Sequence, residues 1–86
     1  MYLQLGQSIV VPENDVIGIF DLDNTTASHI TRRFLSEAEK SGRVISVSDE
    51  LPNSFVVCDG TGGQKIYLSV LSSQTLLKRS EKFSAY

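Results

Sequence analysis

The feature that most constrains this chain is a set of three short, strand-like segments that are apolar on both faces. In the clearest of them, residues 16–20 read Val-Ile-Gly-Ile-Phe, without the alternation of apolar and polar residues that marks a half-exposed strand. Such strands need cover on both faces, and only two segments of the chain have a helical pattern. We therefore expect part of the sheet to be buried against another copy of the protein, since large exposed apolar patches usually mark contact surfaces.

The other segments complete an α+β pattern. Apolar residues recur at spacings of three and four between residues 26 and 41, which predicts an amphipathic helix with Gly42 as its left-handed C-terminal cap. Its N-cap is one of Asn24, Thr25 or Thr26, and a short second helix begins after Ser72 or Ser73. Strands are expected at residues 2–5, 8–11, 16–20, 44–48, 55–58 and 66–71.

The order of these elements is β-β-β-α-β-β-β-α. It predicts a small antiparallel or mixed sheet of about six short strands with two helices, assembled into a ring-like homo-oligomer. The glycine-rich residues 59–63 lack the spacing of a phosphate-binding loop, so we interpret them as a hairpin turn. At this length the chain is expected to be one domain over residues 1–86, with a frayed tail at residues 83–86.

Composition excludes several classes of site. The single cysteine, Cys58, lies in an apolar strand, cannot form an intramolecular disulfide and indicates a small buried residue. His29 is the only histidine, so neither a histidine metal site nor a catalytic triad is expected. We expect no metal and no cofactor. The N-terminus lacks a signal-peptide pattern and no apolar run is long enough to cross a membrane, which predicts a cytoplasmic protein.

The formal net charge of −2 gives no general attraction to nucleic acid, but the basic residues gather in the two helical segments. If subunits close into a ring, these patches repeat and can follow a phosphate backbone. The alternative is an ordinary solvated helix face, on which Arg33 pairs with Glu37. Our candidate nucleic-acid-binding residues are Arg32, Arg33, Arg43, Lys78 and Arg79, and our candidate interface residues are Ile9, Val11, Ile17, Ile19, Val56 and Tyr67.

One short motif suggests an enzyme. Asp21-Leu22-Asp23-Asn24 follows an apolar strand and resembles the first motif of haloacid dehalogenase phosphatases, in which the first aspartate is the nucleophile. That family needs a doubly wound parallel sheet with helical crossovers, and 86 residues with hairpin connections cannot supply it. We therefore interpret the motif as a strand end followed by a helix cap, with a phosphatase as the third hypothesis.

Longer stretches carry a stronger resemblance. The chain is similar to the extracellular matrix regulatory family of spore-forming Gram-positive bacteria, the RemA and RemB type, and specifically to its RemB-like branch. The stretches that carry this are residues 1–11 (MYLQLGQSIVV), 16–23 (VIGIFDLD), 34–44 (FLSEAEKSGRV), 55–59 (FVVCD) and 66–79 (IYLSVLSSQTLLKR). The resemblance implies a cytoplasmic regulator of biofilm matrix gene expression whose subunits form rings that present DNA-binding surfaces.

The chain departs from that pattern at two places. DNA-binding members of the RemA branch have an arginine in the turn after the second strand and an arginine pair in the loop before the hairpin. Here these places hold Asn14-Asp15 and Asp49-Glu50-Leu51-Pro52, and the acidic residues repel phosphate. DNA is then met through the candidate residues above, or the protein acts as an oligomeric adaptor through a protein partner. In either case we expect a homo-oligomer and a non-enzymatic regulator, without a membrane or a small-molecule substrate.

Overall fold

A computed structural model of the chain describes residues 2–6, 8–22 and 29–80. These residues form six strands, two α-helices and one 3-10 turn. The strands are β1 (Tyr2–Gln4), β2 (Val10–Pro12), β3 (Val16–Asp21), β4 (Val44–Ser46), β5 (Ser54–Gly60) and β6 (Gly63–Ser69). The helical elements are η1 (Glu13–Asp15), α2 (His29–Lys40) and α3 (Ser73–Arg79). The expected α+β class and the expected order of strands and helices are confirmed.

The strands belong to two sheets, so the expectation of one small sheet was wrong. The larger has the order β3-β5-β6-β4, in which β3, β5 and β6 pair antiparallel and β4 runs parallel to β6. The smaller is the antiparallel pair β1-β2, in which Leu3 lies opposite Val11. Both of these side chains are buried while their neighbours on each strand are exposed. The pair therefore has one apolar face and stacks on the larger sheet, instead of extending its edge.

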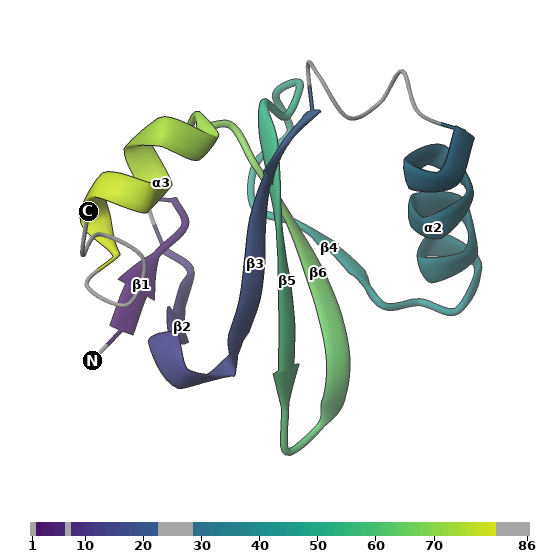
Figure 1. Cartoon of the computed structure of the whole chain (residues 1–86), viewed down its shortest axis with the longest axis horizontal. Helices are drawn as coiled ribbons and strands as arrows, with labels where there is room; N and C mark the ends of the chain where they lie inside the picture. Colours follow the sequence, from purple (N-terminus) through teal and green to yellow (C-terminus); the bar gives the residue numbers. More distant parts are fainter. Residues whose placement is uncertain (1, 7, 23–28, 81–86) are drawn as a thin grey trace.

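The molecule has three layers, with the four-stranded sheet in the middle (Figure 1). On one side β1, β2 and α3 cover the sheet, and Leu3, Leu5, Val56 and Leu76 lie in the apolar cluster between them. On the other side α2 packs through Ala38 against a second cluster. The chain thus covers much of the second sheet face with its own β1-β2 pair and α3. Sequence reasoning had expected a neighbouring copy to cover that face.

Local signals explain where the helices begin and end. Gly42 has φ 73°, and its N–H donates to the carbonyl of Glu39 at 3.0 Å, so the predicted left-handed cap of α2 is confirmed. The Ser72 hydroxyl accepts the N–H of Thr75 at 3.1 Å and caps α3. The proposed N-cap residues of α2, Asn24, Thr25 and Thr26, lie outside the described residues.

The last two strands form the predicted hairpin. Gly60 pairs with Gly63 across the turn, and Gly63 has φ 94°, a conformation that glycine adopts without strain. The β5 strand then runs through the centre of the sheet between β3 and β6, and all five residues from 54 to 58 are buried. The long apolar run is therefore explained by a central strand that is covered on both faces.

Candidate nucleic-acid interface

The predicted basic residues lie on two opposite sides of the molecule. Arg32 and Arg33 are exposed on α2, and Lys78 and Arg79 are exposed in the last turn of α3. Because α2 and α3 cover opposite faces of the four-stranded sheet, one subunit does not bring the two pairs together (Figure 1). Each pair is a separate patch.

Arg43 differs from the other four because it is half-buried and structurally engaged. Its guanidinium donates to the side-chain carbonyl of Gln64, and its backbone N–H donates to the carbonyl of Ala38 at 2.9 Å. Its own carbonyl accepts the N–H of Ile66 at 2.9 Å. Arg43 therefore joins the end of α2 to β6, and is less available to an external phosphate than the helix residues.

The helix residues keep their charges available. Arg32, Arg33, Lys78 and Arg79 form no ion pair with the part of the chain that the structure describes, so the expected pair of Arg33 with Glu37 is not made there. At the end of α3, positive charge also complements the helix dipole. Exposed cations without a fixed partner are the kind of group that can release counterions on contact with a polyanion.

Acidic residues lie close to one of the two patches. A groove of about 710 Å³ runs between the β1-β2 connection, the loop after β4 and the end of α3. Asp49 and Glu50 line this groove together with Arg79. Leu51, the next residue, is 90% exposed. The two carboxylates weaken the field of Arg79, as the exposed Glu37 and Glu39 weaken the field of the α2 arginines.

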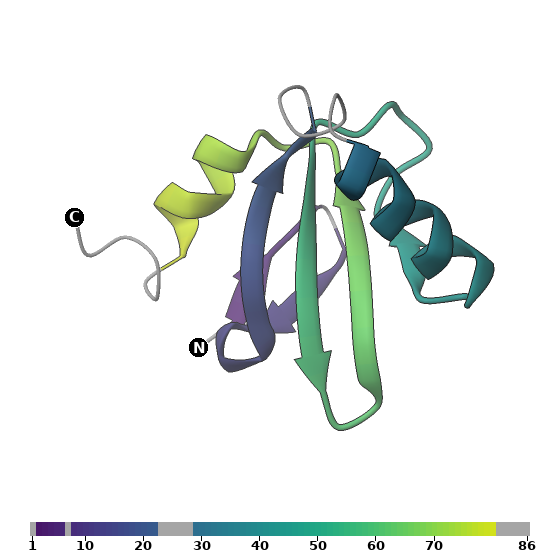
Figure 2. The ribbon, with the colours of Figure 1, turned by 45° about the vertical axis from the view of Figure 1, so that its right-hand side comes forward.

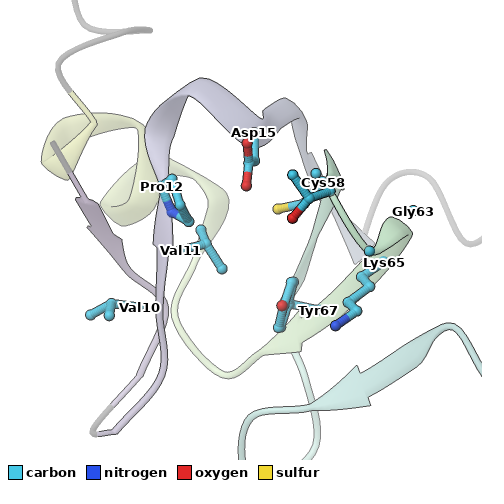
Figure 3. A pocket seen from close by; sticks show the side chains of 11 residues that line it. Val10, Val11, Pro12, Asp15, Cys58, Gly63, Lys65 and Tyr67 are labelled. Carbon is cyan, nitrogen blue, oxygen red and sulfur yellow. The ribbon is translucent and has the colours of Figure 1, made fainter.

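The second acidic position, Asp15, is turned inward. It is half-buried in η1 and lies against Gly60, where an added Cβ would meet Asp15 Oδ2 at 2.7 Å. Figure 3 shows Asp15 and Cys58 beside Tyr67 around a small hollow of about 170 Å³. Burial raises the pKa of Cys58 to about 11, and Asp15 adds to this effect. Burial, with Cys58 and Asp15, also raises the pKa of Tyr67.

This hollow does not have the chemistry of a reactive site. A thiol with a raised pKa stays protonated at neutral pH and is a poor nucleophile, which agrees with the interpretation of Cys58 as a small buried residue. Among the described residues, no group of three His, Cys, Asp or Glu is placed to hold a metal ion. No described helix is long and apolar enough to span a membrane.

The phosphatase motif follows an edge strand that pairs antiparallel, whereas its chemistry requires the end of a central parallel strand. Asp21 ends β3, which is an outer strand of the sheet and pairs antiparallel with β5. Asp23 lies outside the described residues. A doubly wound fold would place the motif at the carboxyl end of a central parallel strand, between crossover helices. The observed sheet does not provide that arrangement.

The six candidate interface residues are distributed unequally. Val11 and Val56 are 4% and 0% exposed inside the subunit's own core, with the half-buried Ile9, Ile19 and Tyr67 packed against the same cluster. Ile17 is the exposed member of the set, at 57%, and lies at an irregularity in the pairing of β3 with β5. Core packing thus accounts for the apolar character of most of these positions.

Sequence reasoning missed the exposed apolar residues that the fold separates from the core. Tyr2 and Val10 lie on the outer face of the β1-β2 pair, and Leu77 is exposed on α3. Phe20 is 40% exposed and stacks on Phe55, with 5.0 Å between the ring centres. The alternation in β1 was a usable signal for Tyr2, whereas the exposure of Phe20 depends on how far α2 extends over the sheet.

Two comparisons with known proteins identify the family of this chain. The family model of RemA-like proteins, described as extracellular matrix regulatory protein A-like, matches residues 2–79. The extracellular matrix regulatory protein B of Bacillus subtilis (strain 168) is 38% identical over 81 residues, which cover 94% of this chain and 91% of that protein. The family-model match extends across all the described strands and helices, and the relative covers most of the chain. The chain therefore belongs to the RemA-like family of extracellular matrix regulatory proteins.

Proposed function

We propose that this protein is a non-enzymatic, cytoplasmic regulator of biofilm matrix genes that assembles from identical subunits into a ring and contacts DNA directly. One observation carries the DNA contact: Arg32, Arg33, Lys78 and Arg79 are exposed and form no ion pair with the described residues. A protein with a net charge of −2 can bind a polyanion only where such cations gather locally. Arg43 is not counted among these cations, because its guanidinium is held by Gln64.

Assembly multiplies this local charge. The described residues of one subunit present only a few exposed cations on each helix: Arg32, Arg33 and Lys40 on α2, and Lys78 and Arg79 on α3. So few contacts bind a duplex only weakly. A ring repeats both patches at fixed spacing, so that a duplex touching several subunits gains from each of them. The exposed apolar residues Tyr2, Val10, Ile17, Phe20 and Leu77 supply the surface that such an assembly would bury.

A titration with duplex DNA at two salt concentrations tests the proposal. For each phosphate that the protein neutralises, affinity should fall by about 0.9 decade per decade of salt. Replacing Arg32 and Arg33 by Gln should reduce this slope. As a control, replacing the exposed Lys65, near the hairpin turn at the start of β6, by Gln should leave the slope close to the wild-type value. A wild-type protein that fails to bind even at low salt would rule out direct DNA contact.

The adaptor remains the second candidate, and the loop after β4 is the observation that favours it. Asp49 and Glu50 are exposed at the position of the arginine pair in DNA-binding relatives, and Leu51 beside them is almost fully exposed. A single apolar side chain flanked by carboxylates suits contact with a basic protein surface. Absence of DNA binding combined with a stable homo-oligomer in native mass spectrometry would support the adaptor over the DNA-binding ring.

A further inference from the structure

We propose that the small hollow between β2, η1 and the β5-β6 hairpin binds a small organic cation, a primary ammonium group on a short apolar body, through the carboxylate of Asp15. Its described lining residues come from these elements, and not from the helices that carry the candidate DNA contacts. Figure 3 shows the side chains around it. The inference therefore goes beyond the proposed function and does not depend on it.

The anchor of this site is a carboxylate that the fold holds in place without a partner. Asp15 is half-buried and forms no hydrogen bond or ion pair with the described residues. A Cβ added at Gly60 would meet Asp15 Oδ2 at 2.7 Å, so the carboxylate lies directly against the backbone of β5. The element that carries Asp15 is also fixed, because the buried Glu13 accepts the hydroxyl of Ser80 at 2.7 Å. A positioned, partly desolvated carboxylate is stabilised by a charged hydrogen-bond donor.

The electrostatic field beside Asp15 is negative. Burial raises the pKa of Cys58, and the charge of Asp15 raises it further. Burial, with Cys58 and Asp15, likewise raises the pKa of Tyr67. Both groups are therefore neutral at neutral pH and do not offset the carboxylate. Lys65 also lines the hollow, but its side chain is exposed and forms no ion pair with the described residues. The region beside Asp15 thus favours a positive group.

The rest of the lining defines the body of the ligand. Val11 and Pro12 lie on one side of the hollow and Tyr67 on the other, so an apolar group would contact side chains on both sides (Figure 3). The hollow has a volume of about 170 Å³. A cavity of about 150 Å³ in another protein holds one benzene molecule, so the occupant here has about six to ten non-hydrogen atoms. Benzylamine, with an aromatic ring and one ammonium group, is a probe of this size and charge.

Matched ligands test the sign of the charge. Benzylamine, benzyl alcohol and benzoate are similar in size and are positive, neutral and negative at neutral pH. We expect benzylamine to bind in the millimolar range, because so small a ligand makes few contacts, and to shift the amide NMR signals of Cys58 and Gly60 in the lining. The alcohol and the benzoate lack the charged donor and should bind at least about tenfold more weakly. No binding of benzylamine, equal binding of all three ligands or a preference for benzoate would overturn the proposal.

Three variants locate the site. Asp15→Asn keeps the shape of the side chain, removes its charge and should weaken benzylamine binding by at least about tenfold. Gly60→Ala keeps the charge but displaces the carboxylate, and should also weaken binding. Asp59→Asn is the matched control, because it removes an exposed carboxylate of the same hairpin and should change the affinity by less than about twofold. Equal losses in Asp15→Asn and Asp59→Asn would indicate a general attraction of cations to an acidic surface and would refute the site.

Two further arms identify the kind of ligand. Lys65→Gln removes a like charge from the lining and should tighten benzylamine binding, whereas weaker binding would show that the ligand also needs a negative group and would overturn the assignment of a simple cation. Lysine blocked at both ends mimics a side chain of a partner protein. Binding of this compound more tightly than benzylamine would assign the hollow to a partner's side chain in place of a free cation. Circular dichroism of each variant confirms that the fold is retained.

Discussion

At the scale of single residues, Asp15 contributes to packing and to the electrostatic environment of Cys58. In the turn after β2, Asp15 has a carboxylate that is half-buried against Gly60. Burial, with that carboxylate, raises the pKa of Cys58 and keeps its thiol protonated at neutral pH. The turn thus contributes to packing between η1 and β5, and it adds no positive charge to the surface.

Cys58 gives a pH-dependent prediction. Its pKa is about 11 in the folded protein against 9.0 for the unperturbed thiol. Between these values the unfolded chain loses the thiol proton and the folded chain retains it, so stability should fall as the pH rises from 9 to 11. Urea denaturation across this range measures the decline. Cys58→Ala should flatten it in part, since Tyr67 also has a raised pKa and acts in the same direction. An unchanged pH profile in the variant would contradict the assignment.

At the scale of elements, the sequence predicted each strand and helix within a few residues, because caps and turns leave local signals. Gly42 and Gly63 adopt the positive φ values that favour glycine, and Ser72 caps α3. The pattern could not predict that β1 and β2 stack on the main sheet. This arrangement depends on the contact of Leu3 and Val11 with residues more than forty positions away, such as Val56. The sequence identified the individual basic residues, but the separation of the α2 and α3 patches depends on how the elements stack on the main sheet.

The cap of α3 can be tested with a matched pair of substitutions. Ser72→Ala removes the hydroxyl that accepts the N–H of Thr75, and such a loss costs about 1 kcal/mol. Ser73→Ala, at the first residue of the helix, removes a hydroxyl that makes no such bond and should cost much less. Urea unfolding at one fixed protein concentration compares the two variants, because assembly would make stability depend on concentration. Equal losses in both would show that the hydroxyl of Ser72 does not hold the helix end.

At the scale of the whole molecule, the decisive property is that the two sides of the subunit are different. One side presents α2 and the other presents α3 (Figure 2). Phe20 is exposed on the face that α2 covers, and Tyr2 and Val10 are exposed on the outer face of the β1-β2 pair. Sequence reasoning inferred association from strands that were apolar on both faces, yet the chain covers most of those faces itself. The surfaces left over are small and unlike each other. In the proposed ring, contact between different sides of neighbouring copies would cover them, which sequence periodicity alone could not indicate.

The orientation of neighbouring copies can be determined by cysteine cross-linking. We expect a copy carrying Ile17→Cys to form a disulfide with a copy carrying Tyr2→Cys, because the proposed ring would join the exposed side of β3 in one copy to the outer face of the β1-β2 pair in the next. Both sites are exposed in the single subunit, and the native Cys58 is buried with a raised pKa, so it should not compete. Each variant alone should give no cross-link, since copies that meet head to tail do not bring identical residues together. Non-reducing electrophoresis of the mixed and separate proteins measures this. A dimer band from Ile17→Cys alone would show a two-fold contact through β3 and refute a head-to-tail ring.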